Sequence, residues 1–253
     1  MSFLGKVVLI TGASSGIGAA TAHRLAKQGA TLALSGRNVE NLKAVAKDVG
    51  ADKSFVVPGD VTKEADTENI LKNTIEKYGK LDVLINNAGI LETGSIENTS
   101  LEQFDRLINT NVRSIYHLTM LAVPHLIKTQ GAIVNVSSVN GIRSFPGVLA
   151  YNISKTAVDQ LTRCVALELA AKNVRCNSVN PGVTITNLHK RGGMTEDAYA
   201  KFLEHSKTTH AMGRPGQAIE IADAIVFLAG DASSFITGVN LPVDGGRHAM
   251  CPR

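Results

Sequence analysis

The sequence lacks tryptophan, and aromatic residues make up only 4% of its 253 positions. Cysteine is also scarce, since Cys164, Cys176 and Cys251 lie far apart and form neither a Cys-x-x-Cys pair nor a Cys/His cluster with zinc spacing. This pattern excludes a disulfide scaffold and predicts no metal site. Free thiols are typical of a reducing compartment, so we expect a cytoplasmic protein. Without a repeating glycine period, the 7 prolines and 23 glycines exclude a collagen-like chain.

An excess of one charge is also missing, because 26 Lys and Arg residues against 22 Asp and Glu residues leave a net charge of +4. No run of five like charges occurs, and no basic block is interleaved with aromatics. We therefore expect no nucleic-acid partner. The longest nearly apolar stretch, 118–127, is about half of the ~20 residues that a membrane helix needs. The N-terminus enters a strand pattern at once, which leaves no room for a signal peptide.

The 44% of hydrophobic residues follow an alternating pattern of short β-branched runs and longer amphipathic stretches. This pattern predicts one α/β domain over 1–253, in which a doubly wound, seven-stranded parallel sheet has helices on both faces. Pro124 is expected to bend or break the longest helix. The predicted strands are 6–11, 31–35, 54–57, 81–85, 132–137, 174–179 and 239–243, and the predicted helices are 17–28, 39–49, 64–78, 101–127, 151–169 and 219–228.

A glycine-rich turn separates the first strand from the first helix. Glycines at this point permit a tight turn and let the backbone approach a phosphate, which the N–H groups of the helix N-terminus then bind. The sequence therefore predicts a dinucleotide site, although the spacing is G-x-x-x-G-x-G and not the general G-x-G-x-x-G. The residues expected to hold the phosphates are Gly12, Ser14, Ser15, Gly16, Ile17 and Gly18.

The same turn also satisfies G-x-S-x-G, the nucleophile elbow of α/β-hydrolases, with Ser14 as the acyl nucleophile. Two observations oppose this alternative. No strand and loop precede the turn to supply an oxyanion hole, and no Asp/His pair is singled out downstream. The histidines that remain formally available are His189, His205, His210 and His248.

The end of the second predicted strand indicates which nucleotide is bound. NAD-specific sites carry an acidic residue about 20 residues after the glycines, where it binds the ribose. Here the strand ends in Ser35-Gly36-Arg37-Asn38, with no acid. Because the Arg37 guanidinium can form charge-assisted hydrogen bonds with a 2′-phosphate, we expect NADP(H) to be preferred, with NAD(H) as the alternative.

Tyr151 and Lys155 are four residues apart at the start of a predicted helix and therefore face the same way. A tyrosine is a poor acid–base group at neutral pH, and a neighbouring ammonium lowers its pKa. Ser138 ends the fifth predicted strand, at the edge of the sheet where ligands bind in doubly wound folds. These residues together indicate an acid–base site.

At this point the sequence resembles the short-chain dehydrogenase/reductase family, whose members have a Rossmann-type fold. The resemblance covers essentially the whole chain, with the motifs in the family's order. They are the Thr11–Gly18 turn, Asp60-Val61, Asn86-Asn87-Ala88-Gly89, Asn111, Ser138, Tyr151-x-x-x-Lys155, Pro181-Gly182 with Thr186, and Val243-Asp244-Gly245-Gly246. The basic residue that some NADP-preferring relatives carry before the middle glycine is replaced by Ser15, which leaves the discrimination mainly to Arg37.

The resemblance implies an enzyme that interconverts a carbonyl and a secondary alcohol. Tyr151 would be the general acid or base, Lys155 would hold the nicotinamide ribose and lower the pKa of Tyr151, and Ser138 would bind the substrate oxygen. Asn111 would hold a water in a proton relay. Asp60 and Val61 would border the adenine. The segments expected to contact the rest of the cofactor are Asn87, Ala88 and Gly89 at the adenine ribose, and Pro181, Gly182, Val183, Thr184 and Thr186 at the carboxamide.

The segment 184–213 breaks the alternating pattern and looks like the family's substrate lid, with a hinge at Gly192-Gly193 and a short helix over 196–205. Its apolar candidates for substrate contact are Leu188, Met194, Tyr199, Phe202, Leu203 and Met212, and those of the opposite wall are Val139, Ile142, Phe145 and Val148. The resemblance also implies a homo-oligomer, commonly a tetramer paired through the helices at 101–127 and 151–169. A nucleotide sensor without catalysis remains an alternative.

Overall fold

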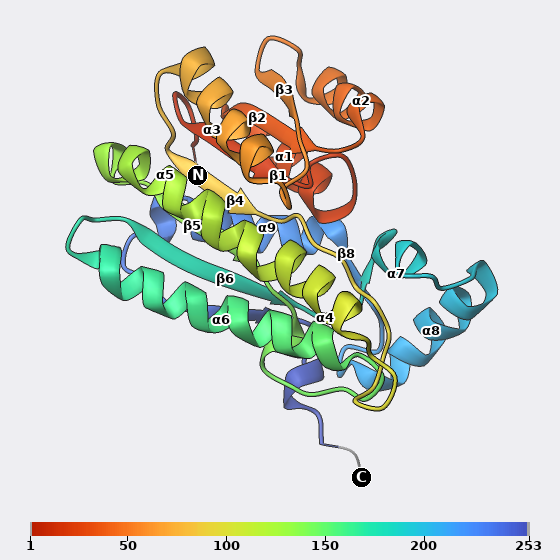
Figure 1. The fold of residues 1–253 in the computed structure, drawn as a ribbon. Coiled ribbons are helices and arrows are strands. Elements are labelled where there is room, and N and C mark those ends of the chain that lie inside the picture. The colour runs from red at the N-terminus through yellow and green to blue at the C-terminus, as the bar shows by residue number, and fades with distance from the viewer. Residues whose placement is uncertain (1, 252–253) are drawn as a thin grey trace.

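The computed structural model describes residues 2–251, which form an α/β fold around a parallel sheet (Figure 1). Within these residues the main sheet has seven strands in the order β3-β2-β1-β4-β5-β6-β9. Every neighbouring pair in it is parallel, so the predicted doubly wound fold is confirmed. The strands are β1 Val7–Thr11, β2 Thr31–Gly36, β3 Ser54–Pro58, β4 Val83–Asn86, β5 Ala132–Val136, β6 Arg175–Pro181 and β9 Asn240–Val243.

Helices cover both faces of this sheet. One layer holds α1 (Gly16–Lys27), α2 (Val39–Val49) and α9 (Ala218–Ala229), and the other holds α3 (Glu64–Tyr78), α5 (Ser114–Thr129) and α6 (Leu149–Ala170). The continuous apolar run of β1 serves both layers, because Val8 and Ile10 pack on the α1 side while Val7 and Leu9 pack on the opposite side.

The long helical region predicted over 101–127 is interrupted, but not at the proline. It divides into α4 (Leu101–Ile108), a π-helical turn over Asn109–Arg113, and α5. The prediction was that Pro124 bends or breaks this region; Pro124 lies inside α5, so the break is wrong. A proline removes one N–H donor, and the packing of α5 against the sheet and α3 keeps the helix continuous through it. The π-helical turn is a feature that no residue pattern predicted.

The segment predicted as a lid contains more structure than expected. Helix α8 runs over Glu196–Thr209, four residues beyond the predicted end. A short helix α7 (Leu188–Arg191) precedes it and ends at Gly192, and Gly193 follows with a positive φ of 97°. Strands β7 (Thr184–Ile185) and β8 (Gly216–Gln217) pair at the base of the segment. In Figure 1, α7 and α8 project to the side of the body.

No helix in residues 2–251 is long and apolar enough to cross a membrane. In the same residues no cluster of His, Cys, Asp and Glu is arranged to hold a metal ion.

The start of β6 is tied to the end of α9 by one side chain. Arg175 donates to the carbonyl oxygens of Leu228 (2.7 Å) and Gly230 (3.0 Å) and to Ser233 Oγ (2.9 Å). These carbonyls end a helix and would otherwise lack intrahelical partners. The guanidinium therefore caps α9 and fixes the end of this helix to the start of β6.

We expect Arg175→Met to lower the free energy of unfolding by about 2–4 kcal/mol, because several part-buried carbonyls lose a charged donor. For a chain of this size that loss corresponds to a Tm decrease of roughly 4–16 °C in thermal unfolding. Arg163→Met is the matched control, since Arg163 is exposed and bonds only to Gln160 on its own helix. Equal Tm values for the two variants would contradict the capping role.

Candidate active site

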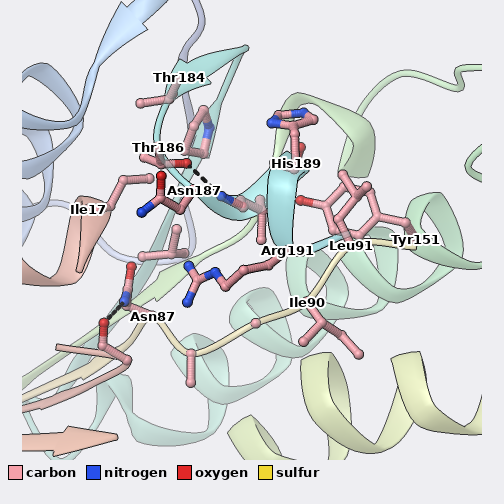
Figure 2. A pocket seen from close by; sticks show the side chains of 18 of the residues that line it. Ile17, Asn87, Ile90, Leu91, Tyr151, Thr184, Thr186, Asn187, His189 and Arg191 are labelled. Carbon is pink, nitrogen blue, oxygen red and sulfur yellow. Dashed lines mark hydrogen bonds between the residues drawn. The ribbon is translucent and has the colours of Figure 1, made fainter. Parts of the chain in front are cut away.

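A cleft of about 1540 Å³ opens at the carboxyl ends of the strands. It exceeds the roughly 300–1,000 Å³ of an ordinary small-molecule pocket. Its walls come from the turn after β1, the segments that follow β2 to β6, and the segment 184–213 that was predicted as a lid (Figure 2). The cleft therefore lies where ligands bind in doubly wound sheets, and it has room for an extended ligand together with a second, smaller one.

The glycine turn lies very close to the segment that follows β4. Gly12 has a positive φ of 64°, and a Cβ there would lie 2.8 Å from Asn87 Nδ2. A Cβ on Gly18 would overlap the Gly12 carbonyl oxygen. Asn87 Nδ2 in turn donates to Thr11 O (2.9 Å) and Gly12 O (3.1 Å), and it points at this turn in Figure 2. The turn thus has the bare backbone that a bound pyrophosphate requires.

The N-terminus of α1 faces the cleft with its backbone donors available. Ser15 is the N-cap residue, but its side chain makes no capping hydrogen bond. The first turn of α1, all of it described in the structure, contains no acidic residue that would repel an anion. Helix N–H groups and the positive end of the helix dipole therefore fit the phosphates of a dinucleotide.

Arg37 and Asp60 line the same cleft as the glycine turn. Arg37 follows β2 and Asp60 follows β3. Arg37 is exposed. Asp60 Oδ1 accepts hydrogen bonds from Thr62 N (3.0 Å) and Thr62 Oγ1 (2.8 Å). Burial raises the pKa of Asp60, but these hydrogen bonds and the positive charges of Arg37 and Lys63 outweigh it, so the net pKa is lowered. Val61 lines the cleft beside Asp60.

Ser138, Tyr151 and Lys155 meet on the opposite side of the cleft. Ser138 follows β5, while Tyr151 and Lys155 occupy the first turns of α6, each with 5% of its surface exposed. Ser138 Oγ accepts from Asn140 N (3.1 Å), and Lys155 Nζ donates to Val136 O (2.9 Å). Lys155 Nζ lies 5.6 Å from the centroid of the Tyr151 ring.

Burial controls the ionisation of this pair. It raises the pKa of Tyr151 to about 12, although an interaction with the Ser138 hydroxyl partly offsets the increase. It lowers the pKa of Lys155 to about 8, against the opposing effect of Asp159. The structure therefore does not show the lowered tyrosine pKa that was expected from Lys155, because desolvation of the phenol dominates. Tyr151 carries its proton at neutral pH.

Asn111 lies behind the cleft, in the π-helical turn, and is fully buried. Its Oδ1 accepts from Ile90 N (2.9 Å), and its Nδ2 donates to Ile90 O (2.9 Å) and Ser154 Oγ (3.0 Å). The side chain thus joins the segment after β4 to α6. Like Gly18, it supports the cleft without lining it, whereas the other residues predicted to bind the cofactor, together with Ser138, Tyr151 and Lys155, lie along the wall.

A histidine that the sequence did not single out for this half of the site supports the segment after β6. Val183 N donates to His210 Nε2 (3.1 Å), so the ring proton lies on Nδ1, which donates to Ser206 O (2.8 Å). Burial lowers the pKa of His210, in keeping with this neutral form. No sequence signal could have found it, because the contact joins the end of α8 to a loop 27 residues away.

Thr186 closes the same region from the lid. A Cβ on Gly16 would lie 3.2 Å from Thr186 Cγ2, so the residue reaches the glycine turn. Its carbonyl accepts from Tyr199 Oη (3.0 Å). The segment predicted to hold a carboxamide, Pro181, Gly182, Val183, Thr184 and Thr186, lies along the cleft wall in full.

The predicted substrate contacts divide into two groups. Val139, Phe145, Val148, Leu188, Met194 and Phe202 line the cleft. Ile142, Tyr199, Leu203 and Met212 lie outside its lining, so their expected contact with a substrate is not supported. Tyr199 packs the lid together instead, since Lys190 Nζ lies 5.0 Å from the centroid of its ring.

The serine-hydrolase alternative gains no support. Ser14 lies on the glycine turn, and within residues 2–251 its hydroxyl has no hydrogen bond to a histidine. His210 is bound to Val183 and Ser206, and His248 Nδ1 is paired with Asp244 (2.9 Å). The geometry assembles no nucleophile–base pair at Ser14.

The fold, the glycine turn and the Ser/Tyr/Lys group define a dinucleotide-dependent oxidoreductase. A family model described as enoyl-(acyl carrier protein) reductase matches residues 12–248. The chain belongs to the short-chain dehydrogenase/reductase family, and it is an NAD(P)-dependent enzyme of that family.

Named relatives match along the whole chain. A 3-oxoacyl-(acyl-carrier-protein) reductase of Thermotoga maritima is 39% identical over 97% of this chain and 99% of its own length. The meso-2,3-butanediol dehydrogenase of Serratia marcescens is 38% identical over 98% and 97%. Among solved structures, a 3-ketoacyl-(acyl-carrier-protein) reductase from Brucella melitensis complexed with NADH has a TM-score of 0.89 and 35% identity, covering 98% of this chain and 100% of that one.

We expect Gly18→Ala to lower the free energy of unfolding by about 1–3 kcal/mol and to weaken dinucleotide binding, since the new methyl group would displace the Gly12 carbonyl. Chemical denaturation and fluorescence titration with NADPH measure the two effects. Gly216→Ala is the control, because a Cβ there meets nothing closer than 3.7 Å. Unchanged stability and affinity in Gly18→Ala would mean that the turn adapts freely.

Proposed function

We propose that this oxidoreductase interconverts a carbonyl and a secondary alcohol with NADP(H), and that Tyr151 is its acid–base group. The observation that carries the proposal is the convergence of Ser138, Tyr151 and Lys155 on one wall of a cleft whose other half fits a dinucleotide. A site built only to sense the nucleotide has no need of a buried phenol and ammonium facing the cleft. The sensor alternative is therefore less well supported.

Each side chain of this group has a distinct task. Ser138 donates a hydrogen bond to the carbonyl oxygen and orients it. Tyr151, whose pKa burial raises to about 12, holds the proton that this oxygen needs when the carbonyl is reduced. The ammonium of Lys155 stabilises the phenolate that remains after the proton is given up. When bound, the nicotinamide supplies the hydride, and Lys155 would hold its ribose.

Asn111 is a positioning residue in this proposal. Its side chain is already satisfied by Ile90 and Ser154. The π-helical turn around it disrupts the ordinary helical hydrogen-bond ladder, a feature frequent at functional sites. We propose that this turn holds the water through which Lys155 exchanges protons with solvent. Gly89 leaves space beside this route, since a Cβ there would lie 3.3 Å from Asn111 Oδ1 and 3.7 Å from Lys155 Nζ.

The remaining predicted roles belong to other residues along the cleft wall. Asp60 and Val61 border the adenine, Asn87 to Gly89 pass its ribose, and Pro181 to Thr186 hold the carboxamide. The lid over 184–213 closes on a substrate that meets Val139, Phe145 and Leu188. The relatives act, by their names, on 3-oxoacyl groups, butanediol and glucose, so the substrate is a small carbonyl compound or alcohol.

Replacing Tyr151 with Phe removes the hydroxyl group that donates the proton and keeps the aromatic ring. We expect kcat for ketone reduction to fall by about 10²–10⁴-fold, while the Kd for NADPH, measured by fluorescence, changes by less than about threefold. Tyr116→Phe is the control, because Tyr116 is exposed on α5. A Tyr151→Phe enzyme that kept most of its kcat would overturn the mechanism, and one that lost NADPH binding would indicate a structural role.

Replacing Arg37 with Asp tests the cofactor preference. We expect the Kd for NADPH to rise about 10–100-fold, because a charge-assisted hydrogen bond worth roughly 1.5–3 kcal/mol is replaced by repulsion. The Kd for NADH should change by less than about threefold, since NADH has no 2′-phosphate. Arg37→Met separates lost attraction from added repulsion. Equal losses for both nucleotides would contradict the NADP(H) preference and favour NAD(H).

We also propose a homo-oligomer assembled through α5 and α6. Large apolar side chains are exposed on both helices, namely Tyr116 and Met120 on α5 and Ile153 and Leu167 on α6. Light scattering at micromolar concentration should give the mass of a dimer or tetramer. Leu167→Glu, at a position that is 82% exposed, should shift the mass downwards without changing the circular dichroism spectrum. A monomeric wild-type protein would exclude this assembly.

A further inference from the structure

The substrate half of the cleft contains a cation that the proposed mechanism does not use. Arg247 begins a short 3₁₀ turn, η4 (Arg247–Ala249), shortly after β9, and it lines the cleft wall. Its guanidinium carbon lies 4.4 Å from the centroid of the Phe145 ring. Stacking on an aromatic face fixes the plane of a guanidinium and leaves its edge free to bind a ligand.

This guanidinium has no anionic partner in the part of the chain that the structure describes. No carboxylate oxygen of residues 2–251 lies within 4.0 Å of it, and its Nε is buried without a hydrogen-bond partner. Asp244 is the nearby acid, but its carboxylate accepts from Gly246 N (3.1 Å) and His248 N (2.6 Å) and pairs with His248 Nδ1. Burial lowers the pKa of Arg247, and Asp244 only partly offsets this effect.

The other charged groups on this side of the cleft are already paired. Lys190 Nζ lies 2.7 Å from Glu196 Oε2, and Arg106 Nη2 lies 2.8 Å from Glu92 Oε2. Arg191, which is exposed, reaches into the cleft in the direction of Asn87, that is, towards the dinucleotide half (Figure 2). Arg247 is therefore the cation that faces the substrate half without a partner among the described residues.

Hydrogen bonds from Arg143 hold the segment that carries Arg247. Arg143 donates to the carbonyl oxygens of His248 (2.7 Å) and Met250 (3.0 Å), which ties the segment after β9 to the loop that also carries Ser138 and Phe145. The guanidinium and the proposed oxygen-binding hydroxyl are thus presented by two connected segments. On the side of segment 184–213, His189 Nδ1 is also buried without a partner within residues 2–251. Burial, with a smaller contribution from the charge of Arg247, lowers the pKa of His189.

We propose that the substrate of this enzyme is an oxo acid, whose carboxylate binds Arg247 while its carbonyl oxygen binds Ser138 and Tyr151. An unpaired guanidinium costs free energy where it is desolvated, and a carboxylate in the cleft would form a charge-assisted hydrogen bond with the part of Arg247 that lines it. The neighbouring Phe145, Val139 and Leu188 would contact the carbon chain between the two polar ends. This assignment rests on the proposed carbonyl reductase activity.

The test compares oxo acids with their methyl esters, over chains that separate the carbonyl from the carboxylate by one to four carbons. For the best chain, kcat/KM with NADPH should favour the acid by at least about tenfold in the wild-type enzyme. Arg247→Met should bring the acid/ester ratio near one, and Arg247→Lys should retain part of the preference. Lys172→Met, which removes an exposed positive charge elsewhere, should keep the wild-type ratio.

Ligand binding to the wild-type protein tests the anion site without turnover and without a variant. Saturated carboxylates of the same lengths should bind the NADPH-saturated wild-type protein more tightly than their methyl esters in calorimetry, and more weakly as salt is raised. Sulfonate and phosphate analogues that bind more tightly than carboxylates would overturn the oxo-acid assignment. Equal wild-type affinity for acids and esters, or an equal loss for both in Arg247→Met, would overturn the role of Arg247. If neither acids nor esters are reduced while carboxylates still bind, the proposed activity fails and the anion site stands.

Discussion

The close approach of the turn after β1 to the segment after β4 is the contact on which the rest of the site depends. Thr11 Oγ1 accepts from the backbone N–H groups of Asn87 (3.0 Å) and Ala88 (3.1 Å), while the Asn87 side chain donates back to the turn. Two loops that would otherwise be mobile therefore brace each other at the edge of the sheet. Side chains at Gly12 or Gly18 would push the two loops apart. The absence of side chains therefore both lets the loops meet and leaves their backbone open to a ligand.

A second set of buried polar groups holds the side of the cleft that carries Ser138, Tyr151 and Lys155. Asn180 Nδ2 donates to Ser138 O (2.8 Å) and to Asp159 Oδ2 (2.8 Å), and Ser137 Oγ donates to Lys155 O (3.1 Å). These hydrogen bonds join β5, β6 and α6 directly behind Ser138 and Lys155. The network fixes the positions of these side chains at the cost of burying charge, and the same burial raises the pKa of Tyr151 and lowers that of Lys155.

Local patterns in the sequence were sufficient for the sheet, for the glycine turn and for the group of Ser138, Tyr151 and Lys155. The β-branched runs and the glycine, Asn-Asn-Ala-Gly and Tyr/Lys motifs are short-range signals, and the structure brings their residues to one edge of the sheet. The π-helical turn at Asn111 could not be predicted, because the hydrogen bonds from Asn111 to Ile90 and Ser154 join distant elements. Arg247 and His210 were missed for the same reason, since each acts through a contact that only the folded chain creates.

The two cations at the ends of the cleft act in different electrostatic environments. Arg37 is exposed, so solvent and salt screen its charge, and its proposed discrimination between nucleotides would depend on direct hydrogen bonds with a phosphate. Arg247 is partly buried, with a desolvated Nε that lacks a partner within residues 2–251. An anion bound there would interact through a lower dielectric and restore a hydrogen bond that the described chain does not make. On the proposed assignments, one charge bound at Arg247 would therefore gain more free energy than one bound at Arg37.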